Sequence, residues 1–152
     1  MAGFKGKYEH SVDDKGRVSL PSKIRKFLSP EANDTFVITR GYEEYSLYLY
    51  PLDVWNRYED TLRSQLNVHR AEDRMIVRTL MMWAHEVTLD RQSRLMIPQE
   101  HLEFSEITTS VVIIGALEKI ELWSPDRFRE FYYQQHPERS LESMAARVLG
   151  GV

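Results

Sequence analysis

Short segments in which apolar and polar residues alternate open the chain and recur later in it. Tyr8–Val12 and Arg17–Leu20 flank the sequence DDKG, and this pattern predicts two strands joined as a hairpin through a tight turn. Pro21 then starts a short segment with helical spacing, followed by the apolar strand Thr35–Thr39 and the aromatic-rich strand Leu47–Tyr50. The pattern predicts a unit with the order strand, strand, short helix, strand, strand.

The same order of elements returns 77 residues later in the chain. At this offset five positions are identical: Glu9 and Glu86, Asp13 and Asp90, Arg17 and Arg94, Pro21 and Pro98, and Phe27 and Phe104. A window of ~20 residues gives about one identity by chance, so the match indicates an internal repeat. We therefore predict a first unit over residues 1–52 and a second unit over residues 85–124.

Apolar residues with helical spacing follow each unit. They predict a helical connection over residues 53–84, interrupted near residues 67–69, and C-terminal helices over residues 125–152. Ser124 is expected to cap the first C-terminal helix and Pro137 to end it. One half of ~75 residues would bury too little surface to be stable alone. We expect an α+β fold in which two related halves pack around a pseudo-two-fold axis.

The composition is typical of a soluble protein with a substantial core. Of the 152 residues, 42% are hydrophobic and 11% are aromatic, which is enough apolar surface for a packed interior. Cysteine is absent, which excludes disulfide bonds and thiolate metal sites. No segment has the apolar pattern of a signal peptide or of a membrane-spanning helix. We expect a cytoplasmic protein that does not associate with membranes.

The charge is unevenly distributed along the chain. The net charge is −3, but residues 1–26 contain seven basic and three acidic residues and so carry +4, which leaves −7 on the remainder. This asymmetry permits an anionic partner to bind near the N-terminus of an otherwise acidic protein. Ordinary surface charge accounts for the distribution equally well.

Catalytic and cofactor-binding motifs are not found in the sequence. Its five histidines do not form H-E-x-x-H or another metal-ligand spacing, and G-x-S-x-G, P-loop and G-x-G-x-x-G motifs are missing; the histidines are His10, His69, His85, His101 and His136. We therefore expect a protein that is not an enzyme and that has no cofactor and no metal site.

The turn and the residues after it resemble a known DNA-binding unit. The sequence DDKGRVSLP matches D-x-K-G-R-[LV]-x-[LV]-P, which is similar to the signature of the AbrB-like (SpoVT-AbrB) swapped-hairpin domains. Two copies with LYLYPLDVW between them and helices after each copy resemble the MraZ family of bacterial transcriptional regulators. The genes of this family stand at the head of the division and cell-wall gene cluster. The resemblance covers essentially the whole chain.

The resemblance implies a fold, an assembly and a partner. In single-copy relatives two chains exchange hairpins to form a dimer. Here one chain would supply both halves, as two β-hairpin units that form a small barrel-like β core, each unit followed by helices. The two turns would lie on the same side and present their arginines to DNA. Such proteins assemble into homo-oligomeric rings and bind short, regularly spaced direct repeats in double-stranded DNA upstream of their own operon. This chain would then be cytoplasmic and associated with the nucleoid.

The first turn supplies most of the expected DNA-binding residues. Arg17 has the fork geometry that binds guanine O6 and N7, and a two-stranded ribbon fits the major groove. Lys15 and Lys23 are expected to contact phosphates, and Gly16 to take a positive φ angle in the turn. Asp13 is expected to hold the turn through backbone N–H groups or to orient Arg17. A simple surface ion pair between Asp13 and Arg17 is the alternative.

The second turn departs from this pattern. Arg94 and Asp90 are retained, but DRQSR has Ser93 in the glycine position and Gln92 in the lysine position. Because serine tolerates a positive φ angle less well than glycine, we expect this turn to differ in shape. Arg91 adds a basic side chain that compensates for the lost lysine. The helix after the first turn carries Lys23, Arg25 and Lys26, whereas the matching helix of the second copy carries Glu100 and Glu103. The first turn is therefore expected to dominate DNA binding.

A protein-binding module is the alternative function. The acidic remainder of the chain and the exposed turns are compatible with a ring-forming scaffold for a partner protein. An antitoxin-like role is another form of this alternative, because AbrB-like hairpins also occur in antitoxins. The basic turn Lys15-Gly16-Arg17 favours DNA, since a scaffold has no need of it.

Overall fold

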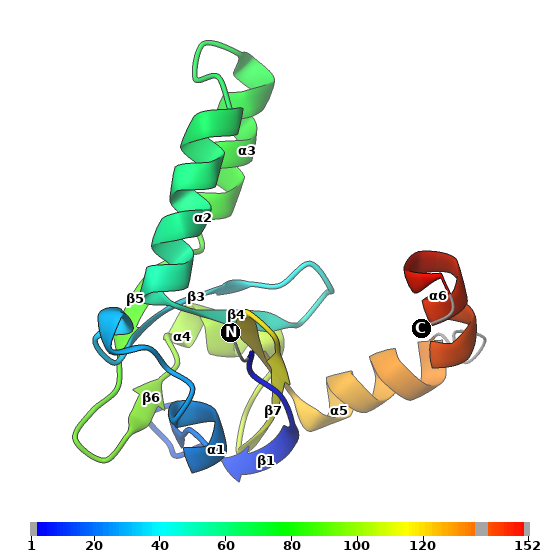
Figure 1. The fold of residues 1–152 in the computed structure, drawn as a ribbon. Helices are drawn as coiled ribbons and strands as arrows, with labels where there is room; N and C mark the ends of the chain where they lie inside the picture. The colour runs from blue at the N-terminus through cyan, green and yellow to red at the C-terminus, as the bar shows by residue number, and fades with distance from the viewer. Residues whose placement is uncertain (1–2, 136–139, 151–152) are drawn as a thin grey trace.

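The computed structural model describes residues 3–135 and 140–150, and within them the chain forms an antiparallel β body from which helices project (Figure 1). In chain order the elements are β1 (Lys7–Ser11), β2 (Arg17–Ser19), α1 (Ser22–Arg25), η1 (Pro30–Ala32), β3 (Thr35–Arg40), β4 (Leu47–Pro51), α2 (Leu52–Gln65), α3 (Ala71–Met81), β5 (His85–Thr88), β6 (Arg94–Met96), α4 (Gln99–Ser105), β7 (Ser110–Ala116), β8 (Lys119–Trp123), α5 (Pro125–Arg129), η2 (Glu130–Gln135) and α6 (Leu141–Leu149). The predicted order of strands and helices and the α+β class are confirmed.

The strands form one six-stranded sheet and one two-stranded ribbon. The sheet has the order β1-β7-β8-β4-β3-β5, and the ribbon consists of β2 and β6. In the repeat β1 corresponds to β5, β3 to β7 and β4 to β8. If each strand of the sheet is replaced by its counterpart, the same order is obtained, read from the other edge. The strand order therefore expresses the pseudo-two-fold relation that the repeat predicted.

The expected pairing of the two strands within each copy is wrong. Among the described residues, β1 pairs with β7 and β5 pairs with β3, while β2 and β6 pair with each other. The first strands therefore join the sheet, and the second strands leave it to form the ribbon. This arrangement lets each copy bury apolar side chains against the other, which one short hairpin cannot do alone. It is an exchange of strands between two halves of one chain, as the resemblance implied.

The ribbon and the sheet enclose a single main core. Val18 of β2 lies opposite Leu95 of β6, and both are buried. They pack with buried side chains of the sheet, including Phe36, Leu49 and Ile113. In the described part of the chain the edge strands β1 and β5 pair with different neighbours and do not close the sheet by hydrogen bonds. The β core is thus barrel-like in enclosing its interior between the sheet and the ribbon.

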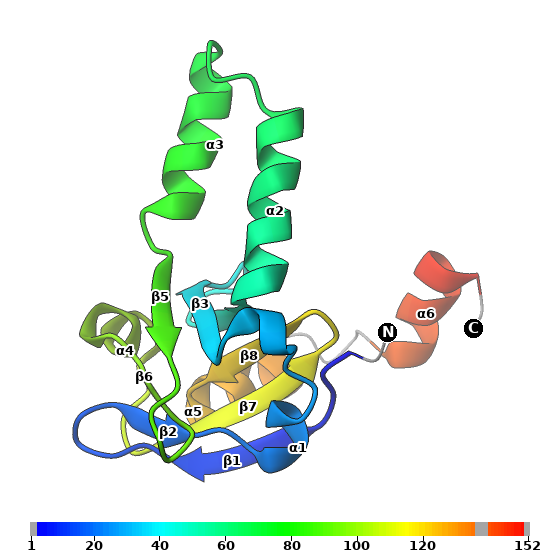
Figure 2. The ribbon, with the colours of Figure 1, turned by 60° about the vertical axis from the view of Figure 1, so that its left-hand side comes forward.

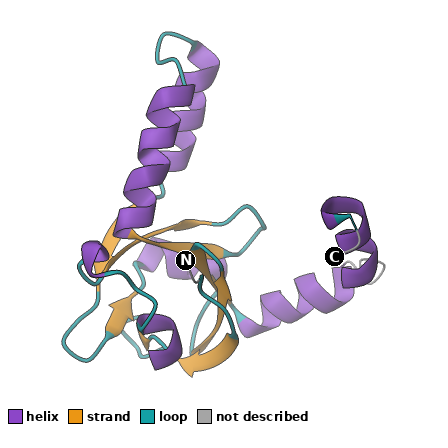
Figure 3. Ribbon diagram, in the orientation of Figure 1, coloured by secondary structure: helices purple, strands orange, loops and turns teal. Residues whose placement is uncertain are grey.

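Two pairs of helices extend away from this body in two directions, whereas α1 and α4 lie against it (Figure 3). Helices α2 and α3 form an antiparallel arm on one side, and α5 and α6 lie on another. The arm contains the predicted helical interruption, and Ser124 caps α5 by accepting a hydrogen bond from the Arg127 N–H at 3.3 Å. Pro137 lies outside the described residues. No helix in the described ranges has the length and apolar character needed to cross a membrane.

Candidate nucleic-acid interface

The turn between β1 and β2 is organised around one carboxylate. Asp13 Oδ1 accepts hydrogen bonds from the backbone N–H groups of Lys15 at 3.0 Å and Arg17 at 2.8 Å, and Oδ2 accepts one from Arg17 Nε at 2.7 Å. The Asp13 N–H donates to the Arg17 carbonyl, and the Gly16 N–H donates to the Asp13 carbonyl, both at 3.0 Å. Asp13 therefore holds the turn and at the same time orients the Arg17 guanidinium.

The turn between β5 and β6 has the same bonding pattern. Asp90 Oδ1 accepts from the N–H groups of Gln92 and Arg94, and Oδ2 accepts from Arg94 Nε, all at 2.9 Å. Ser93 adopts a φ angle of 60°, close to the 82° of Gly16. The expectation that this turn differs in shape is wrong. Ser93 therefore follows the same backbone path as Gly16, although its Cβ makes a positive φ angle less favourable.

A residue from the first copy helps to fix Ser93. Arg25 of α1 donates from Nη1 to Ser93 Oγ at 3.2 Å and from Nε to the Leu20 carbonyl at 3.1 Å. The Leu20 N–H in turn donates to the Ser93 carbonyl at 3.3 Å. In the sequence, Arg25 is simply one of the seven basic residues among residues 1–26. Its contact with the other copy depends on the strand exchange, which the sequence pattern did not reveal.

The short ribbon fixes where the two turns lie. Arg17 pairs with Met96, and Arg94 pairs with Ser19, so each turn lies beside the end of the opposite strand. The Ile97 N–H donates to the Gly16 carbonyl at 2.9 Å. Both turns lie at the part of the β body away from the tip of the α2–α3 arm (Figure 2). The two Asp–Arg pairs are thus joined by one ribbon.

The ion pairs leave part of each arginine accessible. The side chains of Arg17 and Arg94 are 28% and 30% exposed. Their Nε atoms are occupied by Asp13 and Asp90, and the terminal amino groups have no protein hydrogen-bond partner among the residues that the structure describes. A guanidinium held through Nε still presents its two terminal amino groups as hydrogen-bond donors.

Hydrogen bonding also affects the ionisation of the two carboxylates. The backbone N–H of Arg17 is the main cause that holds the pKa of Asp13 below its usual value of 3.8, and the Arg17 side chain adds to the effect. The backbone N–H of Arg94 does the same for the pKa of Asp90. Both carboxylates are therefore ionised at neutral pH and retain the charge that orients the arginines.

The remaining expected residues fall into two groups. Lys15 and Arg91 are exposed in the turns, and Lys23 is exposed on α1. Gly16 is buried, and a Cβ added to it would lie 2.9 Å from Leu102 Cδ1. Gly16 therefore acts on the shape of the turn, whereas the three basic side chains are free to approach a polyanion.

Comparison with known proteins agrees with this architecture. The family model described as "MraZ protein, putative antitoxin-like" matches residues 4–79 and again residues 80–150, so each half of the chain matches once.

The chain belongs to the MraZ family.

Individual relatives match over most of their length. A protein named transcriptional regulator MraZ from Natranaerobius thermophilus is 35% identical over 146 residues, which is 96% of each chain. The MraZ of Halothermothrix orenii is 38% identical over 94% of each chain, and that of Moorella thermoacetica is 38% identical over 84% of this chain and 85% of its own. The likeness therefore extends over both repeats and the arm between them.

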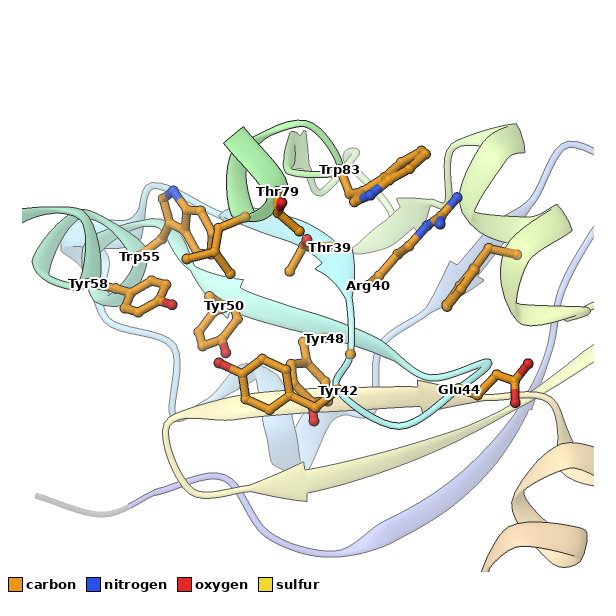
Figure 4. Close-up of a pocket in the computed structure, with 13 residues that line it drawn as sticks. Thr39, Arg40, Tyr42, Glu44, Tyr48, Tyr50, Trp55, Tyr58, Thr79 and Trp83 are labelled. Atoms are coloured by element: carbon orange, nitrogen blue, oxygen red, sulfur yellow. The ribbon is translucent and has the colours of Figure 1, made fainter. Parts of the chain in front are cut away.

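An aromatic pocket lies away from the turns, where the sheet meets the base of the arm (Figure 4). It has a volume of about 400 Å³, and Tyr50 stacks on Tyr58 at its edge. The Arg40 guanidinium lies 3.3 Å from the centroid of the Trp83 ring and 4.2 Å from that of Phe104. The aromatic lining of the pocket comes mainly from β4 and α2, with Trp83 and Phe104 on the far side.

Proposed function

We propose that this protein is a DNA-binding transcriptional regulator that reads sequence with its two Asp–Arg turns. The observation that carries the proposal is that Asp13–Arg17 and Asp90–Arg94 have the same hydrogen bonds and lie at the two ends of one ribbon. A rigid pair of oriented arginines is suited to base recognition, because a bidentate contact to guanine requires a fixed guanidinium plane. The names of the relatives support a regulatory role.

The individual residues then have different roles. Arg17 donates to guanine O6 and N7 through its terminal amino groups, and Arg94 does so more weakly because the helix after its turn carries Glu100 and Glu103 in place of basic residues. Lys15, Lys23 and Arg91 contact phosphates, which provides affinity that depends on salt but not on sequence. Asp13 and Asp90 position the arginines and do not touch DNA.

The proposal includes a ring of identical subunits that binds short direct repeats upstream of the protein's own division and cell-wall operon. Support for self-association comes from the arm, since α3 buries no residue and exposes apolar side chains on its surface. Met75 is 58% exposed and Ile76 is 40% exposed. Several turns binding successive repeats raise the overall affinity well above that of one turn. In this role the protein is not an enzyme and acts in the cytoplasm at the nucleoid.

A salt series tests the proposal. Fluorescence anisotropy is measured with a duplex from upstream of the protein's own gene and with a scrambled duplex of the same composition. The proposal expects preference for the native duplex, and a steep linear fall of log affinity with log salt concentration. Failure to bind either duplex at low salt would overturn it.

A protein-binding role remains the second candidate. It is favoured by α6, which exposes Leu141 and Val148 at 79% each, and the description of the family as antitoxin-like agrees with it. An acidic scaffold or antitoxin-like module needs no basic turn. This alternative therefore predicts that neutralising the turns leaves all binding unchanged, whereas the DNA proposal predicts loss of binding.

A further inference from the structure

Three side chains with metal-binding groups meet at the start of β5, beside the base of the α2–α3 arm. His85 is the first residue of β5, and Glu100 and His101 lie in α4. One donor atom from each lies within 4.8 Å of the other two. His85 Nε2 contacts Glu100 Oε1, and His101 Nδ1 lies 4.0 Å from the same oxygen. The spacing along the sequence gave no sign of this cluster, because only the packing of α4 against the start of β5 brings it together.

His101 is held in the tautomer that a metal ligand requires. Its Nε2 lies 2.8 Å from the backbone carbonyl of Trp83. A carbonyl can only accept a hydrogen bond, so Nε2 carries the proton and Nδ1 carries a free lone pair. Histidines that bind metals commonly donate their other ring N–H to a carbonyl in this way.

The free nitrogen of His101 is also buried. His101 is 1% exposed, and its Nδ1 has no hydrogen-bond partner among the described residues. A buried polar atom without a partner is costly, and each such atom in a folded protein calls for an explanation.

The first copy shows that the fold itself does not require this histidine. At the offset of 77 residues, His101 corresponds to Ile24, which is also 1% exposed. Glu100 corresponds to Lys23, and His85 corresponds to Tyr8. An apolar residue thus fills the same buried position in one copy. All three metal-binding side chains occur together only in the other copy.

We propose that His85 Nε2, the Glu100 carboxylate and His101 Nδ1 bind one divalent transition-metal ion of the zinc type. Two imidazoles and one carboxylate form a donor set that suits Zn²⁺. Donor atoms around a tetrahedral Zn²⁺ with bonds of about 2.0–2.2 Å lie roughly 3.3 Å apart, so the Glu100 oxygen at 4.0 Å from His101 Nδ1 must move under about an ångström toward it, while His85 adjusts to keep its own place. The side chains of His85 and Glu100 are 44% and 45% exposed and are able to make this movement.

The site joins β5 to α4, which are separated in the chain by the second turn and β6. An ion held there links the start of β5 to α4, next to the base of the α2–α3 arm. Its fourth ligand is water, because the His85 and Glu100 side of the cluster is open to solvent. Binding stabilises the folded chain by mass action. The proposal stands independently of DNA binding by the turns.

The test uses the full chain after treatment with a chelator. Isothermal titration calorimetry with Zn²⁺ is expected to give one site per chain, and the melting temperature is expected to rise with Zn²⁺ concentration. His85→Ala and Glu100→Gln should each weaken binding at least about tenfold. His101→Ile, which copies Ile24, should abolish binding while the metal-free protein stays folded. Co²⁺ should give the visible spectrum of a four-coordinate ion with nitrogen ligands.

His69→Ala is the matched control, since His69 is exposed in the loop between α2 and α3. This variant should bind Zn²⁺ as the wild type does. Two results would overturn the proposal: absence of saturable Zn²⁺ binding in the wild type, or unchanged binding in both His85→Ala and His101→Ile.

Discussion

Gly16 and Ser93 occupy the same left-handed backbone position in the two copies of one turn, with φ angles of 82° and 60°. Each donates its N–H to the carbonyl of the aspartate three residues earlier. One turn uses the residue that adopts this conformation without strain, and the other has a serine whose hydroxyl accepts a hydrogen bond from Arg25. The shape of the turn is therefore maintained in both copies although their sequences differ.

Gly16→Ala is expected to destabilise the protein. A Cβ at this position would meet Leu102 Cδ1 at 2.9 Å and the Ile97 carbonyl oxygen at 3.0 Å, in addition to the backbone strain. The expected loss in the free energy of unfolding is about 1–3 kcal/mol, measured by urea denaturation. Ser93→Ala is the control, since a Cβ is already accommodated there, and it should cost under about 1 kcal/mol. Equal losses would contradict this account of the two turns.

The ribbon that holds both turns depends on its buried face. Leu95 is fully buried, whereas its neighbour Met96 points to the opposite face and is 52% exposed. Leu95→Ala should lower the free energy of unfolding by about 2–5 kcal/mol, and Met96→Ala by less than about 0.5 kcal/mol. Thermal or urea unfolding of the two variants measures the difference. Similar effects at the two positions would show that the ribbon does not pack on the core as described.

Acid should weaken both turns. The folded-state pKa values of Asp13 and Asp90 lie below the ordinary 3.8, so their ionised forms stabilise the folded protein above that pH. This contribution is lost as the pH falls through the folded-state values. Carboxyl carbon chemical shifts measured by NMR between about pH 6 and about pH 2 should show both groups titrating below 3.8. In Asp13→Asn the Asp90 titration should persist unchanged. A pKa of Asp13 at or above 3.8 would contradict the hydrogen bonds described for this turn.

The exposed face of α3 should be needed for self-association. Met75→Glu places a charge on an apolar surface that the proposed ring buries, so the assembly should dissociate into smaller species. Light scattering coupled to size-exclusion chromatography measures the mass. Gln65→Glu adds the same charge at an exposed polar position of α2 and should leave the assembly intact. If Met75→Glu retains the wild-type mass, α3 does not lie at the contact between subunits.

The sequence contained most of the local structure but not the pairing of strands. Alternation of apolar and polar residues located β1 and β2, and the offset of 77 residues located their counterparts β5 and β6. Alternation identifies which face of a strand is buried but does not identify its neighbour. The exchange between halves therefore followed only from the family resemblance, and the paired hairpin that local reasoning favoured is wrong.

The features that the sequence did not reveal all depend on contacts between distant segments. The hydroxyl of Ser93, a residue with a positive φ angle, accepts a hydrogen bond from Arg25, which lies 68 positions away. The cluster of His85, Glu100 and His101 forms only when α4 packs beside β5. Propensity and spacing describe neighbours along the chain, so they carry no information on such contacts. The boundaries 1–52, 53–84, 85–124 and 125–152 remain predictions as domain limits.

Arg17→Ala provides the most direct test of the central claim that the turns read DNA. Anisotropy with a duplex from upstream of the protein's own gene is compared for wild type, Arg17→Ala, Arg94→Ala and the control Arg63→Ala, which removes an exposed arginine from α2. We expect Arg17→Ala to lose about 1–3 kcal/mol of binding free energy for each bound turn and to lose the preference over a scrambled duplex. Arg94→Ala should show a smaller loss, and Arg63→Ala should bind as the wild type does. Unchanged binding by Arg17→Ala, or an equal loss in Arg63→Ala, would contradict the claim.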